Sequence, residues 1–398
     1  MNAFFNLRTP PLITYGSGSF KKISEVAALK GKKALIISDK MMEQLGNVDR
    51  CVGFLEKCRV SSVVYLGVET EPTDQYVAEA LQMFNESACD HIISLGGGSC
   101  IDTAKAVSVL VGNDGNIDDF AGGKRVADQP PIPHIAIPTT AGTGSEATDV
   151  TVITNTSNQV KLMIKQPAFM PAAAIVDPEL SKSSPKHVTA ATGVDALSHA
   201  IEAYLSKKSH PMTDMLAFSA MELIVKNIRD AYTDGCNMEA REKMSLGSLE
   251  AGMAFTNASV CLVHGMSRPI GALFHVPHGF SNAMLLPAVL EFSRDSCVER
   301  LADLGRVFTL DKDLSDEEAA DIAVNSVSGL CADLNIPNLK GWGIDEEAFI
   351  LAVGKMAKDA MDSGSPANNP RVPTLQELQE LYLYCYDYQF SGKGAAAK

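Results

Sequence analysis

Apolar residues in the first half of the chain fall into short runs of the kind that form buried strands, and most of these runs end at glycine, serine, threonine or aspartate. Helical patterns separate several of the runs. Short strands that alternate with helices are typical of an α/β domain with a parallel sheet. The expected strands are residues 11–18, 33–39, 62–66, 91–95, 133–138 and 172–180.

Beyond Pro185 the pattern changes to long segments rich in Ala, Leu, Met and Glu, separated by clusters of Gly, Pro and Asn. We therefore expect an all-helical second half, and we place the domain boundary so that residues 1–185 form the α/β domain and residues 186–398 the helical domain. The expected helices are residues 189–205, 211–232, 238–254, 298–306, 317–334, 345–358 and 375–386.

Composition and charge limit the class of protein. The chain has 398 residues, 46% hydrophobic and 21% charged, an ordinary globular composition that is long for a single core. A formal net charge of −14 argues against nucleic acid or an anionic membrane as partner, because both require a basic surface. Nine dispersed cysteines without a C-x-x-C pair fit reduced thiols. With no long apolar run and no signal-peptide layout, the expected location is cytoplasmic.

A possible metal site arises from two separate segments. His264, His275 and His278 lie within fifteen residues of an apolar, glycine-rich segment, and buried imidazoles are unfavourable unless something binds or neutralises them. Asp195 and His199 lie four residues apart, and therefore on one face of an expected helix. Alone, such a pair is often solvated. Combined with two histidines of the other segment, it makes a ligand set that suits Fe2+ or Zn2+.

Two loops of the first half have the chemistry of a nucleotide site. Gly96–Ser99 leads from a strand into a helix, where free backbone N–H groups and the positive helix end favour a pyrophosphate, although the spacing is not G-x-G-x-x-G. A second loop offers the hydroxyls of Thr139, Thr140 and Thr143. Asp39 ends the second strand, where it either accepts hydrogen bonds from ribose hydroxyls or caps the following helix.

Residues Gly193–Glu202 and the segment His264–His278 resemble the two signatures of the iron-dependent (group III) alcohol dehydrogenases, and the likeness spans nearly the whole chain. The resemblance implies a Rossmann-like NAD-binding domain followed by a helical metal-binding domain, in a dehydroquinate synthase-like fold. It implies that the metal ligands are Asp195, His199, His264 and His278. The metal is then Fe2+, with Zn2+ as the alternative, and Asp39 favours NAD over NADP.

Taken together, the loops and the resemblance give ten candidate cofactor-binding residues: Asp39, Gly97, Gly98, Ser99, Asp102, Thr139, Thr140, Thr143, Lys161 and Leu180. Among them, Asp102 is expected to tether the glycine loop, and Lys161 is assigned by resemblance alone to the ribose or nicotinamide. Two positions depart from the family pattern. Glu71 stands where some relatives carry an Asn that contacts the adenosine, and Val150 replaces a polar residue near the cofactor.

The activity implied is the interconversion of a small primary alcohol, diol or hydroxy acid with its aldehyde by hydride transfer to or from NAD. Many relatives carry a further histidine four residues after the third ligand, where this chain has Arg268. Arg268 either binds a substrate carboxylate or phosphate or is a structural ion-pair partner. His275 is then the candidate proton relay, and Phe255 resembles a residue that shapes the substrate pocket.

Other functions are compatible with the same residues. Zinc-dependent polyol dehydrogenases, such as glycerol dehydrogenases, share the two-domain plan and NAD. A metallohydrolase would instead use the four ligands to activate water, and its glycine loops would be purely structural. The expected substrate is a small-molecule alcohol or aldehyde. The expected assembly is a homo-oligomer, either a homodimer or a multiple of it.

Overall fold

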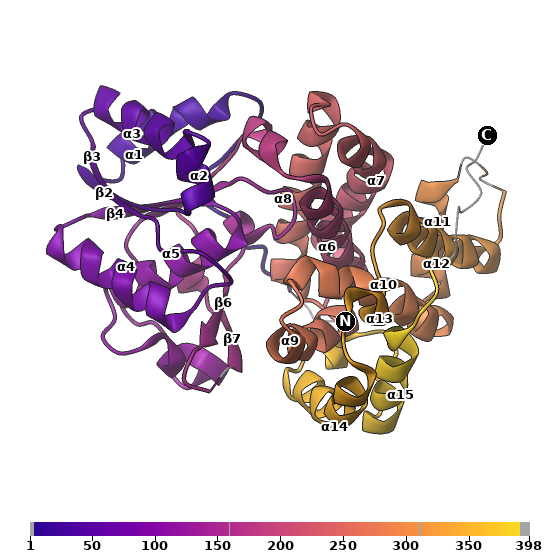
Figure 1. Cartoon of the computed structure of the whole chain (residues 1–398). Helices are drawn as coiled ribbons and strands as arrows, with labels where there is room; N and C mark the ends of the chain where they lie inside the picture. Colours follow the sequence, from indigo (N-terminus) through magenta and orange to yellow (C-terminus); the bar gives the residue numbers. More distant parts are fainter. Residues whose placement is uncertain (1–3, 159, 310, 312, 391–398) are drawn as a thin grey trace. The chain divides into compact units, whose positions relative to one another are not determined.

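The structure is a computed structural model, and it describes residues 4–158, 160–309, 311 and 313–390 (Figure 1). The chain forms two compact units. The first unit spans Arg8–Ser183, and the second contains Ser184 and the residues after it together with the short stretch before Arg8. Strands and helices alternate in the first unit, whereas the described part of the second unit contains helices and loops only.

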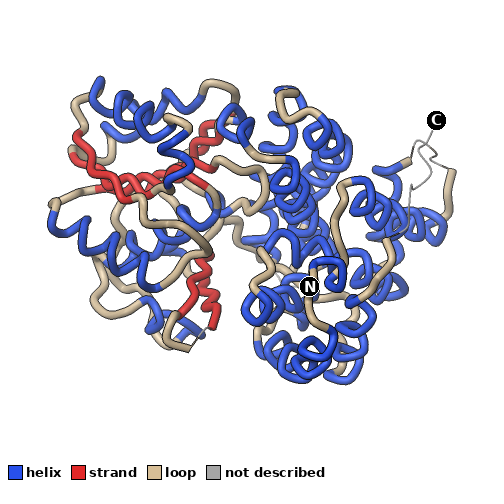
Figure 2. The backbone as a smooth tube through the Cα atoms, viewed as in Figure 1, coloured by secondary structure: helices blue, strands red, loops and turns tan. Residues whose placement is uncertain are grey.

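A parallel sheet forms the centre of the first unit, and strands are red in Figure 2. Its six strands are β1 (Ile13–Tyr15), β2 (Lys33–Ile37), β3 (Ser61–Tyr65), β4 (His91–Gly96), β5 (His134–Pro138) and β8 (Ala173–Val176). They lie in the order β1-β8-β5-β4-β2-β3, and all neighbours are parallel. From β2 the chain moves outward to β3, then returns to the other side of β2 for β4, so the order reverses between β2 and β4.

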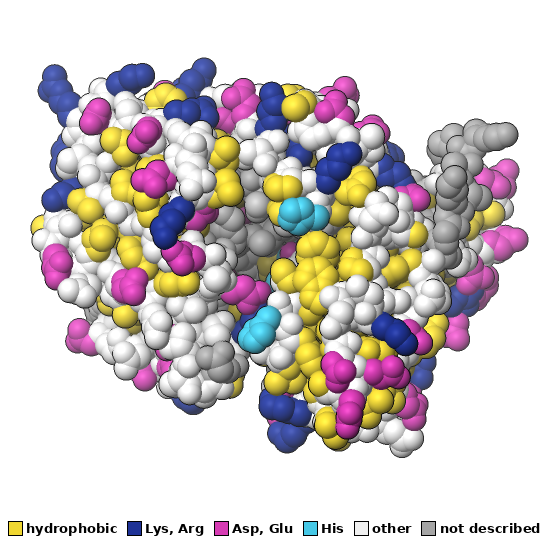
Figure 3. Space-filling model, in the orientation of Figure 1, with side chains coloured by type: hydrophobic (Ala, Val, Ile, Leu, Met, Phe, Trp, Pro, Cys, Tyr) yellow, Lys and Arg dark blue, Asp and Glu magenta, His cyan; other side chains and the backbone are white. Residues whose placement is uncertain are grey.

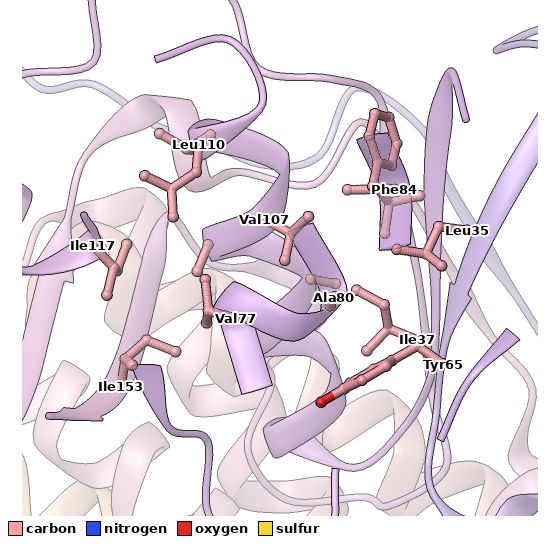
Figure 4. Packing of buried hydrophobic residues seen from close by; sticks show 14 of the residues in the cluster. Leu35, Ile37, Tyr65, Val77, Ala80, Phe84, Val107, Leu110, Ile117 and Ile153 are labelled. Carbon is pink, nitrogen blue, oxygen red and sulfur yellow. The ribbon is translucent and has the colours of Figure 1, made fainter. Parts of the chain in front are cut away.

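Helices cover both faces of this sheet, which explains why its strands read as continuous apolar runs. Ala34 and Ile36 of β2 join the core on one face, with α1 and α3, and Leu35 and Ile37 join the core on the other, with α4 and α5 (Figure 4). Successive residues of a strand point to opposite faces, so all four are buried. The helices are α1 (Ile23–Ala28), α2 (Lys40–Gln44), α3 (Asn47–Lys57), α4 (Asp74–Glu86) and α5 (Gly98–Leu110).

Two features of the first unit differ from the sequence-based expectation. The strand expected at residues 172–180 ends at Val176, and a 3-10 turn, Pro178–Ser183, follows, because Pro178 has no N–H to continue a ladder. An antiparallel hairpin of β6 (Val150–Asn155) and β7 (Val160–Lys165) was not predicted. Its strands are rich in Thr, Asn and Lys, and only part of each is buried, so the apolar pattern is weak.

The second unit is a bundle of helices. Helices α6, α7 and α8 pack against one another, α10 packs on α6, and α9 packs on α10 and α14. The helices are α6 (Lys186–Leu205), α7 (Pro211–Thr233), α8 (Met238–Ala258), α9 (Leu262–Phe274), α10 (His278–Ser293), α11 (Val298–Phe308), α12 (Asp316–Asp333), α13 (Leu339–Trp342), α14 (Glu346–Asp362) and α15 (Leu375–Tyr386). The expected parallel α/β domain followed by a helical domain is therefore confirmed.

Helix α10 was not among the predicted helices. Most of its residues are buried and it contains Pro287, so it has neither an amphipathic period nor an uninterrupted helical pattern. Its first turn comes very close to α6. A Cβ atom on Gly279 would lie 2.9 Å from the carbonyl oxygen of Ala191, so only glycine permits this approach.

The surface carries charges of both signs. On the face drawn in Figure 3, the described Lys and Arg side chains are scattered among Asp and Glu. Within the described ranges, no single helix is long and apolar enough to span a membrane. Helices α8 and α9 pass that test only as a pair, by length and composition, and the chain bends by 101° between them.

Candidate metal centre and cofactor site

Three helices of the second unit bring four potential metal ligands together. Helix α6 contributes Asp195 and His199, α9 contributes His264, and α10 begins at His278. One ligand atom from each residue lies within 4.8 Å of the others. The first three residues are buried and His278 is partly exposed. All four residues predicted as ligands therefore meet at one place.

Two pairs of these atoms are close enough to share an ion. The Oδ1 atom of Asp195 lies 3.7 Å from Nε2 of His264 and 4.0 Å from Nε2 of His278. Two atoms bound to one ion at the usual length of about 2.1 Å are at most about 4.2 Å apart. Both distances fall inside that limit. The one carboxylate and three imidazoles suit a first-row divalent cation.

Glu202, which the sequence analysis did not single out, contacts one of the four candidate ligands. Its Oε2 atom lies 2.5 Å from Nδ1 of His264, and its Oε1 atom accepts a 2.6 Å hydrogen bond from the backbone N–H of Val263. A carboxylate bound to one ring nitrogen keeps a proton there, so Nε2 is the nitrogen of His264 that is available to an ion. Glu202 lies seven residues, or two helical turns, after Asp195 on α6. This spacing places both side chains on one face of the helix, and it was the sequence signal that could have indicated a role for Glu202.

The charges of the cluster compensate one another. Burial lowers the pKa of His264, but the carboxylates of Glu202 and Asp195 outweigh this effect and raise it to about 9. Burial acts to raise the pKa of Asp195, and the imidazoles of His199, His278 and His264 hold it below its usual range instead. Without an ion the cluster thus favours a proton, which a bound cation would displace.

Asn282, also missed by the sequence analysis, lies against three of the four residues. It is fully buried on α10, one turn after His278. Its Nδ2 atom lies 2.6 Å from Oδ1 of Asp195, 3.0 Å from Nε2 of His264 and 3.1 Å from Nε2 of His278. Its position four residues after His278 was the only sequence signal that Asn282 lies near the ligands. The segment around it is apolar and did not indicate a polar role.

The three residues predicted for catalysis occupy different surroundings. Phe255 of α8 stacks on His199, with ring centroids 4.3 Å apart and planes inclined by 15°. The guanidinium of Arg268 donates a 3.1 Å hydrogen bond to Oγ of Ser365. Burial lowers the pKa of Arg268, the charge of Glu202 raises it, and the result is about 10, so Arg268 is a cation at neutral pH.

His275 lies apart from this arrangement of buried groups. It ends α9 with a φ of 54°, in the left-handed region, and its side chain is exposed. It is not one of the four residues whose ligand atoms converge.

On the first unit, the predicted nucleotide residues gather at the carboxyl ends of β2, β4 and β5. A Cβ atom on Gly96 would lie 3.2 Å from Oδ2 of Asp39, and the other oxygen of Asp39 accepts a 2.9 Å hydrogen bond from the N–H of Met42. Asp39 therefore caps α2 with one oxygen and turns the other toward β4. Ligands of open α/β sheets bind at the carboxyl ends of strands where the order reverses, which here is between β2 and β4.

The two predicted loops lie against each other. A Cβ atom on Gly98 would meet Cγ2 of Thr143 at 2.9 Å, and one on Gly97 would meet Thr140 at 3.8 Å. Gly97 caps α5, and Ser99 lies in the first turn of that helix. The positive end of α5 and the threonine hydroxyls thus form one surface.

A network of buried polar side chains holds the two loops in place. Asp102 accepts a 2.5 Å hydrogen bond from Oγ of Ser145 and a 2.9 Å hydrogen bond from the N–H of Val152. Lys105, missed by the sequence analysis, is fully buried and donates to Ser145, Thr148 and the carbonyl of Val150 at 2.6–2.8 Å. Burial lowers the pKa of Lys105 to about 8, although the nearby carboxylates raise it.

Three candidates remain. Lys161 of β7 forms an ion pair with Glu71, one of the two positions that depart from the family pattern. Thr139 follows β5 and is buried. Leu180 lies in the 3-10 turn after β8, and its side chain belongs to the core on the α1 side of the sheet. Leu180 and Lys161 are thus not part of the surface formed by the two loops.

Comparison with known proteins identifies the family. The profile described as iron-containing alcohol dehydrogenase matches residues 10–178, and the profile of the C-terminal part of the Fe-containing alcohol dehydrogenase family matches residues 189–386. A 1,3-propanediol dehydrogenase of Citrobacter freundii is 37% identical over 387 residues, which is 96% of this chain and 99% of that protein.

Comparison with solved structures agrees with this family assignment. A crystal structure of 1,3-propanediol oxidoreductase has a TM-score of 0.92 and 35% identity, covering 96% of this chain and 100% of that one. A sulfoacetaldehyde reductase from Bifidobacterium kashiwanohense in complex with NAD+ has a TM-score of 0.87 and 28% identity, covering 97% and 100%. These likenesses decide between a dehydrogenase and a hydrolase. The chain belongs to the iron-containing alcohol dehydrogenase family and is an alcohol dehydrogenase.

Proposed function

We propose that the enzyme uses NAD and a divalent metal ion to interconvert a small primary alcohol, a diol or a hydroxy acid with its aldehyde. The convergence of Asp195, His199, His264 and His278 within 4.8 Å is the observation that carries this proposal. Fe2+ is the proposed ion and Zn2+ the alternative. Residues 1–185 serve as the NAD-binding domain and residues 186–398 as the metal- and substrate-binding domain.

The chain's own residues prepare the metal centre. A bound divalent cation supplies Lewis-acid stabilisation for negative charge on the substrate oxygen, while NAD carries the hydride. Glu202 holds the proton on Nδ1 of His264 and so keeps the other ring nitrogen free to bind. Phe255 stacks on His199, which fixes that ring and excludes water from one side of the centre.

On the first unit, the N–H groups of Gly97, Gly98 and Ser99 bind the diphosphate at the start of α5. The hydroxyls of Thr139, Thr140 and Thr143 add hydrogen bonds. The Oδ2 atom of Asp39 accepts from the ribose hydroxyls and disfavours the 2′-phosphate of NADP. Asp102 holds the glycine loop in place. Lys161 and Leu180, which lie outside the surface formed by the two loops, complete the proposed set of cofactor-binding residues.

Arg268 and His275 are the proposed residues on the substrate side. Arg268 places a partly buried cation one helical turn after His264, which suits a substrate with a carboxylate or similar anion. The relative named sulfoacetaldehyde reductase takes its name from an anionic aldehyde, in agreement with this idea. His275 is the proposed proton relay. The alternative for Arg268 is electrostatic balance of Glu202 inside the protein.

The experiment is a panel of alcohols and aldehydes with NAD+ and NADH under anaerobic conditions, using protein loaded with Fe2+ or Zn2+. We expect NAD-linked turnover with the wild type and with His187→Ala, whose histidine is exposed in α6, and none with His264→Ala. A hydroxy acid in the panel tests Arg268, because Arg268→Met should raise KM for that substrate alone. Turnover that survives removal of metal would overturn the proposal.

We also propose a cytoplasmic enzyme that forms a homodimer or a multiple of it. Light scattering coupled to gel filtration measures the mass directly. A mass of one chain at micromolar concentration would contradict the proposed assembly.

A further inference from the structure

The thiol of Cys100 lies against the carboxylate that is proposed to bind the adenosine ribose. Cys100 is a buried residue in the first turn of α5, and its Sγ atom donates a 3.7 Å hydrogen bond to Oδ2 of Asp39, 61 residues away in the chain. Burial and the negative charge of Asp39 raise the pKa of this thiol well above its usual value. The thiol therefore stays protonated at neutral pH and remains a donor.

A glycine permits this contact. Gly96, the last residue of β4, lies beside both side chains. A Cβ atom there would meet Sγ of Cys100 at 2.5 Å and Oδ2 of Asp39 at 3.2 Å, and both distances are shorter than ordinary van der Waals contact. The contact between thiol and carboxylate thus depends on the same glycine-rich turn that is proposed to bind the diphosphate.

Both oxygens of Asp39 have donors within the protein. Oδ1 accepts a 2.9 Å hydrogen bond from the N–H of Met42 at the start of α2, and Oδ2 accepts from Cys100. With a bond at each oxygen, the carboxylate is restrained from turning about its bond to Met42. A thiol is a weak donor of one hydrogen bond, whereas each carboxylate oxygen has two lone pairs. Oδ2 consequently keeps one lone pair for a ribose hydroxyl and presents it in a fixed place.

We propose that Cys100 is a positioning residue that fixes Oδ2 of Asp39 and so strengthens the preference for NAD over NADP. The inference rests on the cofactor site proposed above and deepens it. A carboxylate oxygen held in place accepts hydrogen bonds from the ribose hydroxyls and repels a 2′-phosphate. Without the thiol, the carboxylate can turn about its bond to Met42. That movement weakens the contact with NAD and leaves room for the phosphate of NADP.

The ratio of the dissociation constants of NADPH and NADH, each measured by fluorescence titration, tests the proposal. This ratio is informative because a general loss of packing weakens the binding of both cofactors alike. Cys100→Ala removes the donor, and Asp39→Asn removes the charge. Cys51→Ala is the matched control, because it removes a buried thiol of α3 from the core on the α1 side of the sheet. Circular dichroism measures folding.

We expect Cys100→Ala to lower the preference for NADH by about three- to tenfold, the scale of one net hydrogen bond. Cys51→Ala should keep the wild-type ratio. In the Asp39→Asn background, Cys100→Ala should not change the ratio further, because the thiol acts through the carboxylate. A wild-type ratio in Cys100→Ala would overturn the inference, even if both affinities fell. If Cys100→Ala does not fold, Cys100→Val, which fills the space without a donor, gives the same comparison.

Failure of the proposed cofactor site has a different signature. If Asp39→Asn discriminates between the cofactors as wild type does, the proposed role of Asp39 is overturned together with this inference. If Asp39→Asn loses the discrimination and Cys100→Ala keeps it, the proposed site stands and only the role of Cys100 is wrong.

Discussion

The Oε2 atom of Glu202 lies 2.5 Å from Nδ1 of His264, across 62 residues of sequence. A carboxylate in this position decides which ring nitrogen of His264 is available to an ion. The same carboxylate binds the backbone N–H of Val263, so it also fixes the first turn of α9. The orientation of one proposed ligand is therefore set by a residue that does not itself belong to the ligand set.

Replacing Glu202 by Gln should weaken metal binding by about 10- to 100-fold, because the amide no longer holds the proton on Nδ1 as firmly. Chelator competition with Co2+ or Zn2+ measures the effect. Glu222→Gln on α7, where Glu222 pairs with Lys226 on the surface, is the control and should bind as wild type does. Equal affinity in the two variants would show that Glu202 is not needed.

Gly279→Ala should move the start of α10 away from α6, since the new Cβ atom would lie 2.9 Å from the carbonyl oxygen of Ala191. We expect a loss of about 1–3 kcal/mol of stability, as for other overpacked sites, and weaker metal binding because His278 precedes this glycine. Gly354→Ala is the matched control. Its Cβ atom would meet only the end of Gln379 at 3.9 Å, so it should be neutral or slightly stabilising. Thermal melting and ion titration of both variants make the comparison.

Lys105→Met should lower NAD affinity and leave metal affinity unchanged. The buried ammonium holds Ser145, Thr148 and the carbonyl of Val150, and these groups support the threonine loop. Calorimetric titration with NAD+ and with Zn2+ separates the two effects. Lys124→Met, at an exposed position, should change neither. An equal loss of both affinities would indicate general unfolding instead of a local role.

Glu146 should make the stability of the first unit depend on pH. Burial raises its pKa to about 7, although Lys105 and a backbone hydrogen bond lower it. Between about pH 4.5 and 7 the folded state then holds a proton that the unfolded state has lost, so this group's contribution to stability falls as pH rises through that window. Glu146→Gln should remove that fall. Melting temperatures of wild type and variant at pH 5 and pH 8 test this. We expect the melting temperature of the variant to rise relative to that of wild type between pH 5 and pH 8.

His275→Ala should depress turnover and leave metal content intact if His275 relays the proton. The ring is exposed at the end of α9 and lies outside the cluster of four, so its loss should not disturb the centre. Steady-state kinetics and metal analysis are the measurements, with His187→Ala as the exposed control. Turnover equal to that of the control would remove His275 from the mechanism.

Sequence patterns were sufficient to predict features that depend on residues close together in the chain. Asp195 and His199 share a helix face by their spacing, and the strand runs 33–39 and 91–95 are apolar because both faces of the sheet are covered. The parallel α/β half and the helical half were both predicted on this basis.

The missed features depend on contacts between distant segments. Glu202 and Lys105 gain their roles from residues 62 and 40 positions away. Asn282 lies on a helix that is buried on nearly all sides, so its chemistry was hidden in an apolar pattern. The hairpin of β6 and β7 is only partly buried, and partial burial weakens the alternation by which strands are predicted.

The four residues proposed to hold the ion, and Glu202 behind them, all come from the second unit, whereas the glycine and threonine loops come from the first. Because the two sets of residues belong to separately folded units, we expect the loss of an ion from the second unit to leave the contacts within the first unit intact.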